Sequence, residues 1–106
     1  MSKYMFQASY TNDGLKGLFK DGGSKRRDAL EEVVKGMGGS MEVFYYAFGP
    51  DDVFGIANMP DNVSTAALAL VISASGAAKV KTVVLLTPEE IDQATKMSVN
   101  YRPPGQ

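Results

Sequence analysis

The chain has 106 residues, of which 44% are hydrophobic and 22% are charged, as expected for one soluble globular domain. Its formal net charge of −1 creates no field that would attract nucleic acid or an anionic membrane, so we expect neither as a partner. The chain contains no cysteine and no histidine, which excludes disulfides, thiol nucleophiles, serine triads and the usual zinc sites, and we expect no cofactor.

The first predicted element is a strand over residues 3–10, because two kinds of side chain alternate along it. The cap residues at 11–13 and the helical spacing of Leu15 and Leu18 then predict a short helix, which residues 21–23 interrupt. One face of the strand carries Tyr4, Phe6, Ala8 and Tyr10, and the other carries Lys3, Met5, Gln7 and Ser9.

Ser24 opens a longer helix, which Gly38-Gly39 ends. Two strands follow at residues 40–48 and 53–59, and the turn Gly49-Pro50-Asp51-Asp52 joins them into an antiparallel hairpin. The apolar stripe that predicts this helix consists of Ala29, Leu30, Val33, Val34 and Met37.

A second long helix is predicted from the cap residues at 60–62 to about Ser75, and a strand over residues 78–86 follows it. Thr87-Pro88-Glu89-Glu90 is a capping box with proline at the first helical position. This motif predicts a short helix that ends near Met97.

The predicted order is β-α-β-β-α-β with an additional C-terminal helix, which is the plan of the ferredoxin-like α+β fold. We therefore expect a four-stranded antiparallel sheet with its helices on one face. The domain occupies residues 1–99, and we expect residues 100–106 to form an extended or disordered tail.

Both faces of the predicted sheet are apolar over most of their area. In a monomer, the face that no helix covers is usually polar. A large apolar face is more than a monomer normally exposes, so we expect a second copy of the chain to cover it. In the second strand, we place Met41, Val43, Tyr45 and Ala47 on one side and Phe44, Tyr46 and Phe48 on the other.

The second long helix has no charged residue between Val63 and Ala78. Leu68 and Ile72 lie outside the stripe that we predict to face the core, so the helix is apolar on most of its circumference. The chain itself is therefore the expected partner, as a homodimer through the sheet faces or as a larger homo-oligomer. The predicted core stripe consists of Val63, Ala66, Ala67, Leu70, Val71 and Ala74.

These motifs and their order resemble the GYD domain family, whose members are small ferredoxin-like proteins of the dimeric α/β-barrel type. The resemblance rests on Thr11-Asn12-Asp13-Gly14, on the hairpin Gly49-Pro50-Asp51-Asp52 and on Pro60-Asp61, and it covers roughly residues 3 to 92. Asp51 stands where the family has the tyrosine of its motif. The resemblance implies a fold and an assembly but no activity, because the family has no assigned function. The hairpin is also similar to that of ligand-sensing domains in leucine-responsive regulators, which bind amino acids between subunits.

The hairpin residues Gly49, Asp51 and Asp52 admit two interpretations. Adjacent carboxylates can belong to a site for a hard cation, which requires further oxygen ligands from other segments. They can also stabilise the turn by accepting hydrogen bonds from nearby backbone amides. We favour the turn, with Asp52 as the residue that holds the hairpin, and we expect no metal.

The basic cluster Lys25-Arg26-Arg27 stands near a predicted helix start that follows Gly22-Gly23. A helix start of this kind can hold an anion. For Gly22-Gly23 we favour a flexible joint over an anion site. For the basic cluster we favour a solvated first helical turn over a nucleic-acid patch.

Four polar residues are candidates for a small-molecule pocket between two packed sheets: Gln7, Ser9, Tyr45 and Asn58. Such pockets are mostly apolar and contain a few polar anchors. The alternative is that these side chains form hydrogen bonds across the interface or reach water, and bind no ligand.

Two functions remain open at this point. The first is a non-catalytic binding or sensing module that is oligomeric, which the absence of histidine and cysteine favours. The second is a cofactor-free monooxygenase or isomerase, which requires a cavity beside a carboxylate of raised pKa. Because no stretch of the chain resembles a signal peptide or reaches the length of a membrane span, we expect a cytoplasmic protein.

Overall fold

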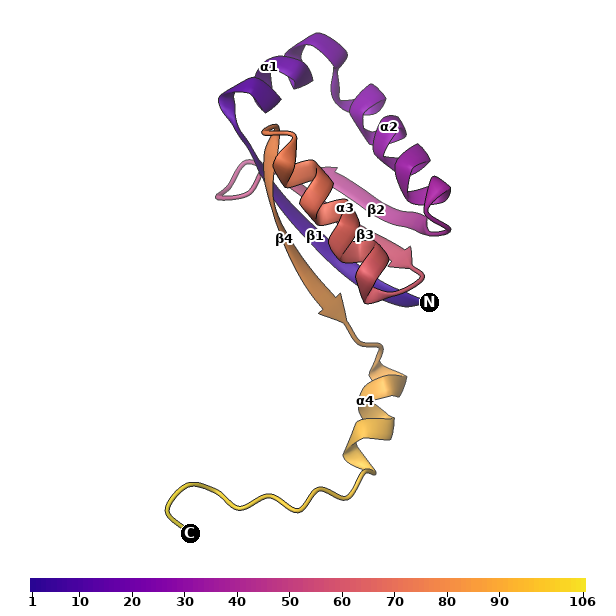
Figure 1. The fold of residues 1–106 in the computed structure, drawn as a ribbon, viewed down its shortest axis with the longest axis vertical. Helices are drawn as coiled ribbons and strands as arrows, with labels where there is room; N and C mark the ends of the chain where they lie inside the picture. Colours follow the sequence, from indigo (N-terminus) through magenta and orange to yellow (C-terminus); the bar gives the residue numbers. More distant parts are fainter.

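The computed structural model describes residues 1–106 and contains one four-stranded antiparallel sheet (Figure 1). Its elements are β1 (Ser2–Tyr10), α1 (Asn12–Asp21), α2 (Gly23–Gly36), β2 (Ser40–Tyr46), β3 (Val53–Met59), α3 (Asn62–Ala74), β4 (Ala78–Leu85) and α4 (Pro88–Thr95). The strand order β2-β3-β1-β4 places β1 and β3 in the centre, as the split β-α-β plan requires. The predicted ferredoxin-like α+β fold is confirmed.

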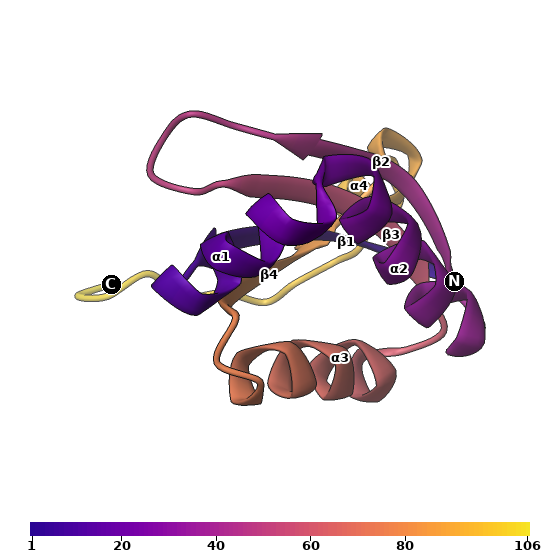
Figure 2. The ribbon, with the colours of Figure 1, turned by 90° about the horizontal axis from the view of Figure 1, so that it is seen from above.

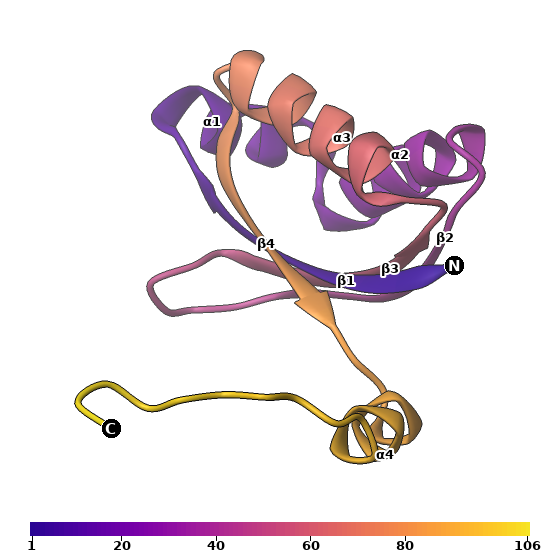
Figure 3. The same ribbon diagram turned by 60° about the horizontal axis from the view of Figure 1, so that its bottom comes forward.

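The sheet has helices α1, α2 and α3 on one of its faces, whereas α4 and the C-terminal tail lie on the side of the other face (Figure 3). Figure 2 shows α3 standing apart from α1 and α2. The molecule is elongated, with extents of 57, 33 and 23 Å along its principal axes. None of its helices combines the length and the apolar character that a membrane span requires.

The turn from β1 into α1 is held by Thr11. Its side chain caps α1 by accepting a hydrogen bond from the Gly14 amide at 3.1 Å, and its amide donates to the Ala77 carbonyl at 3.0 Å. A side chain at position 14 would place its Cβ 2.0 Å from the same Ala77 oxygen, so this close approach requires glycine. The break between α1 and α2 falls at Gly22, whose φ of 83° lies in the left-handed region.

The core is centred on a cluster of five buried hydrophobic residues, contributed by β1, α2, β3 and α3. The Tyr4 hydroxyl reaches the edge of this core and donates a hydrogen bond to the side-chain oxygen of Asn62 at the start of α3. Because its polar tip has a partner, the tyrosine ring can be buried without leaving a hydroxyl unsatisfied. The core residues are Tyr4, Val34, Ala57, Met59 and Leu68.

The predicted facing of the second strand is wrong at Met41. The β2–β3 register shifts between Met41 and Val43, and the shift places the two side chains on opposite faces of the sheet. Met41 packs against the core, while Val43 pairs with Ile56 on the opposite face. The strand also ends at Tyr46 instead of Phe48, because the chain leaves the sheet for the hairpin loop.

The predicted core stripe of α3 is also wrong. Thr65 and Leu68 are buried and Ile72 packs against the core, whereas Val63 and Leu70 are 80% and 70% exposed. An uncharged helix contains no polar face that would indicate its orientation, so periodicity alone chose the wrong side. Thr65 can face the core because its hydroxyl donates to the Asp61 carbonyl at 2.8 Å.

The segment that we call the C-terminal arm, residues 87–106, extends from the body of the molecule (Figure 1). Within it, every residue from Pro88 to Gln106 is exposed. Thr87 and Glu90 form the predicted capping box, which starts α4 without help from the rest of the chain. The arm nevertheless carries large apolar side chains with exposed fractions of 46% to 77%, namely Ile91, Met97, Val99 and Tyr101.

Candidate functional site

The face of the sheet that α1–α3 leave uncovered is called here the open face. At its centre a row of apolar side chains crosses all four strands, because Met5 pairs with both Ile56 and Val83, and Ile56 pairs with Val43. The neighbouring row contains Tyr45, Phe54, Gln7 and Lys81, in that order across the sheet. Tyr45 is 69% exposed and Val83 is 41% exposed, so this face presents aromatic and apolar side chains to its surroundings.

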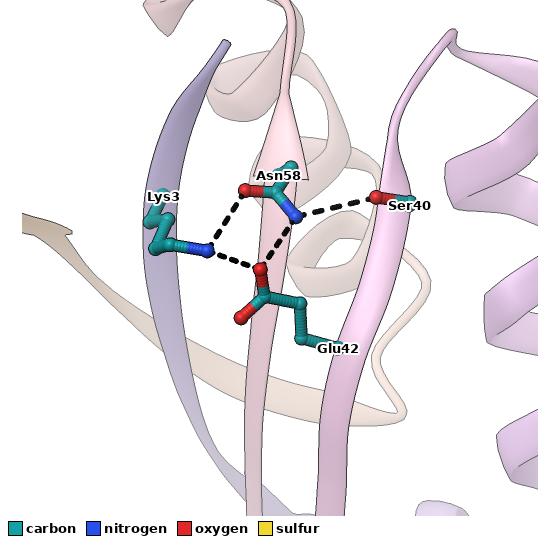
Figure 4. A network of polar contacts seen from close by, with 4 residues as sticks. All are labelled: Lys3, Ser40, Glu42 and Asn58. Carbon is teal, nitrogen blue, oxygen red and sulfur yellow. Dashed lines mark hydrogen bonds and ion pairs between the residues drawn. The ribbon is translucent and has the colours of Figure 1, made fainter.

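A polar network lies at one end of the open face (Figure 4). The Lys3 ammonium donates to the Glu42 carboxylate and, at 3.3 Å, to the side-chain oxygen of Asn58. The Asn58 amide nitrogen donates to Glu42 at 2.9 Å and to the Ser40 hydroxyl at 3.3 Å. Hydrogen bonds from Lys3 and then from Asn58 lower the pKa of the Glu42 carboxyl below its ordinary value. Asn58 therefore has its partners within its own chain.

The other end of the open face is formed by the hairpin. The Ser9 hydroxyl donates to Asp51 Oδ1 at 2.9 Å, and the Lys81 ammonium lies 3.5 Å from the same oxygen. Asp52 points elsewhere, since its Oδ2 accepts a hydrogen bond from the Tyr10 amide at 2.8 Å. The two carboxylates thus bind different partners and do not converge on one position. A side chain at Gly49 would meet no atom within 4 Å, so local space does not require glycine there.

The structure separates the four residues that were predicted to share a pocket. Gln7 and Tyr45 lie in one row of the open face, on either side of Phe54. Ser9 belongs to the hairpin end and Asn58 to the polar network at the opposite end. Tyr45 lines two surface pockets, and Gln7, Ser9 and Asn58 line neither of them nor the cavity described below. Gln7 and Tyr45 are the two that have no side-chain hydrogen-bond partner in their own chain.

A cavity of about 230 Å³ lies on the other side of the sheet, between the helices and the strands. Its walls come from α2, α3 and all four strands, and no aspartate or glutamate lines it. This cavity was not predicted from the sequence. A signal was present, because Arg26 precedes Leu30 and Val34 by four and eight residues and therefore shares their helix face.

Tyr46 stands beside the start of α2. Its hydroxyl donates to the Gly23 carbonyl at 3.0 Å. Burial, followed by the neighbouring Tyr10, raises the pKa of Tyr46 to about 12, while Arg26 and Arg27 act in the opposite direction. Among the carboxyl groups, Glu42 and Asp61 have a shifted pKa, and both are shifted downward. The condition for a catalytic carboxylate, a raised pKa beside a cavity, is therefore not met by these two groups.

Comparison with protein-family models matches residues 4–95 to the model described as the GYD domain. The match covers most of the 106-residue chain and runs from within β1 to the end of α4. No curated protein matches the chain.

Proposed function

We propose that this chain, which belongs to the GYD domain family, is a non-catalytic binding module in which two copies pack through their open faces. The observation that supports this proposal is the apolar row of Met5, Val43, Ile56 and Val83 at the centre of an uncovered sheet. In a monomer, an antiparallel sheet with helices on one face presents polar side chains on the other.

The distribution of charge on the open face agrees with an interface. Lys3 pairs with Glu42 at one end, and Lys81 lies near Asp51 at the other. The charged groups therefore flank the apolar row instead of interrupting it. An apolar centre with a polar rim is the usual anatomy of a protein interface.

The C-terminal arm provides a second line of support. It lies on the open-face side of the sheet (Figure 3), and its side chains Ile91, Met97 and Val99 are exposed. A copy that packs against the open face would meet this arm and could bury those side chains. The arm would then hold the partner while the sheets form the centre of the interface.

Gln7 and Tyr45 are the proposed polar anchors of a ligand between the two sheets. Both residues lie in the row beside the apolar row, and neither side chain has a hydrogen-bond partner within its own chain. An amide and a phenol next to Phe54 would suit a small molecule that combines an apolar body with one or two hydrogen-bonding groups. Ser9 and Asn58 would support this space from its two ends through the contacts that they already make.

Light scattering on purified protein tests the assembly. The wild type is expected to have a mass near twice the 11.4 kDa of one chain. Val83→Asp places a charge in the apolar row and is expected to give a folded monomer, because burying an unpaired carboxylate is strongly unfavourable. Val63→Asp, at an 80% exposed position on α3, is the matched control and is expected to leave the mass unchanged. A monomeric wild type, or equal effects of the two substitutions, would refute the proposed interface.

A further inference from the structure

The cavity between the layers arises because α2 and α3 cover the sheet without closing over it (Figure 2). Seventeen residues line it and fourteen of them are hydrophobic, including Phe6, Phe44 and Leu68. The cavity is partly open to solvent, and its apolar walls hold water poorly. A recess of about 230 Å³ with such walls is suited to a small apolar guest.

One end of the cavity differs from the rest. Arg26, near the start of α2, is the only charged residue of the lining. Tyr10 at the end of β1 and Ser75 at the end of α3 line the cavity at the same end of the layers. The opposite, deeper wall contains Val34 and Leu68, which belong to the hydrophobic core. The cavity is thus polar at one end and apolar along its length.

Arg26 has no anionic partner in the chain. Its neighbour Arg27 pairs with Asp28 at 3.1 Å, but Arg26 forms no ion pair. The first turn of α2 contains no acidic residue that could serve as one. A guanidinium group stays protonated in proteins and binds carboxylates through two parallel hydrogen bonds. A half-buried, unpaired arginine at the end of an apolar cavity therefore favours a ligand that supplies a carboxylate.

We infer that the cavity binds a small apolar monocarboxylate, with its carboxylate on Arg26 and its hydrocarbon body between α2, α3 and the sheet. This inference goes beyond the proposed self-association, because a single protomer forms the whole cavity on the face opposite the proposed interface. The body of the ligand is either an alkyl chain or an aryl ring, since both fit an apolar wall that contains Phe6 and Phe44.

The experiment compares three probes of one chain length by calorimetry, below their micellar concentrations. Octanoate is expected to bind and to raise the melting temperature, whereas neutral octanol and cationic octylamine are expected to bind more weakly. 3-Phenylpropionate in a parallel titration distinguishes an aryl ligand from an alkyl one. If octanoate does not bind, or binds no better than octylamine, the inference is wrong.

Two pairs of variants locate the site. Arg26→Gln is expected to weaken octanoate binding by about tenfold or more, because it removes charged hydrogen bonds. Arg27→Gln removes the same charge one residue away and is expected to leave binding unchanged. Equal effects of the two substitutions would show that octanoate responds to general charge and would overturn the assignment.

The second pair tests the cavity itself. A Cβ at Gly55 would meet its nearest atom at 3.4 Å, and the two methyl groups of Gly55→Val would occupy part of the cavity that Gly55 lines. Gly17→Val, where an added Cβ meets no atom within 4 Å, is the control. Octanoate binding is expected to be lost only in the filled variant, and undiminished binding there would contradict the inference. Ala8→Val, at another lining position, replaces Gly55→Val if circular dichroism shows that the latter is unfolded.

Measuring mass and binding together separates this inference from the proposed dimer. The Val83→Asp variant is expected to be monomeric and still to bind octanoate. If Arg26→Gln and Gly55→Val change the mass of the assembly and not the octanoate affinity, the cavity receives side chains of another copy and the inference fails.

Discussion

The carboxylate of Asp52 accepts a hydrogen bond from the backbone amide of Tyr10 at 2.8 Å, which joins the hairpin loop to the last residue of β1. The Asp52 amide in turn donates to the Ala8 carbonyl at 2.8 Å, and its carbonyl accepts from the Ala47 amide at 2.9 Å. Asp52 therefore extends the hydrogen bonding of the sheet past the end of β2 and the start of β3. These hydrogen bonds give the hairpin aspartate a structural role that requires no ligand.

Replacing Asp52 by alanine is expected to destabilise the protein by about 1–3 kcal/mol, because it leaves the half-buried Tyr10 amide without its charged acceptor. Asp92→Ala, at an exposed position in α4, is the control and is expected to change stability by no more than about 0.5 kcal/mol. Urea unfolding followed by circular dichroism measures both. Equal stabilities of the two variants would contradict the role assigned to Asp52.

Leu68 and Leu70 test the orientation of α3. Leu68 is 5% exposed and Leu70 is 70% exposed, although the two residues are chemically identical. Leu68→Ala is expected to cost about 2–5 kcal/mol through loss of burial and creation of a cavity. Leu70→Ala is expected to cost less than about 1 kcal/mol in the same urea titration. The reverse ranking would restore the stripe that helical periodicity alone predicts.

The Lys3–Glu42–Asn58 network predicts a dependence of stability on pH. The folded-state pKa of Glu42 is below its ordinary value of 4.5, so its contribution is present above the unfolded pKa and is lost as pH falls through the folded value. Glu42→Gln is therefore expected to be less stable than the wild type near neutral pH. The difference between the two is expected to shrink at pH values well below 4.5.

Unfolding curves at several pH values measure this difference. Glu32→Gln, at an exposed position without an ion pair, is the control and is expected to change stability by no more than about 0.5 kcal/mol at each pH. A difference between wild type and Glu42→Gln that grows on acidification would mean that the network does not stabilise the fold.

Removal of the C-terminal arm separates folding from assembly. Because residues 88–106 are exposed in their own chain, a chain ending at Leu86 is expected to keep its circular dichroism spectrum apart from the signal of α4. Its dimer is expected to dissociate at a higher protein concentration than the wild-type dimer, as light scattering on dilution would show. If the truncated dimer dissociates at the same protein concentration as the wild-type dimer, the arm takes no part in the interface.

The parts of the fold that the sequence predicts best are those with one clear pattern. The run Val53–Met59 and the turn residues at 49–52 predicted β3 with its observed bounds. The capping residues Thr11, Asp61 and Thr87 likewise marked three helix starts. In each case the signal is local, because a strand face or a helix cap depends on a few neighbouring residues.

The features that sequence reasoning missed depend on contacts between distant segments. The shift at Met41 is a property of the β2–β3 pairing and cannot be seen in β2 alone. The packing of Leu68 into the core decides the orientation of α3. The sequence of an apolar helix does not indicate which of its sides faces the core. The cavity beside Arg26 exists because α2 and α3 stand apart, and no pattern within either helix determines that separation.

The central claim is that the open faces of two copies meet, and contacts between copies can be measured directly. In a sample that mixes methyl-labelled and unlabelled chains, filtered nuclear Overhauser spectra record only contacts between different copies. We expect such contacts at the methyl groups of Val43, Ile56 and Val83 and none at Val63. Contacts at Val63 and Leu70 with none in the apolar row, or no contacts at all, would contradict the proposed interface.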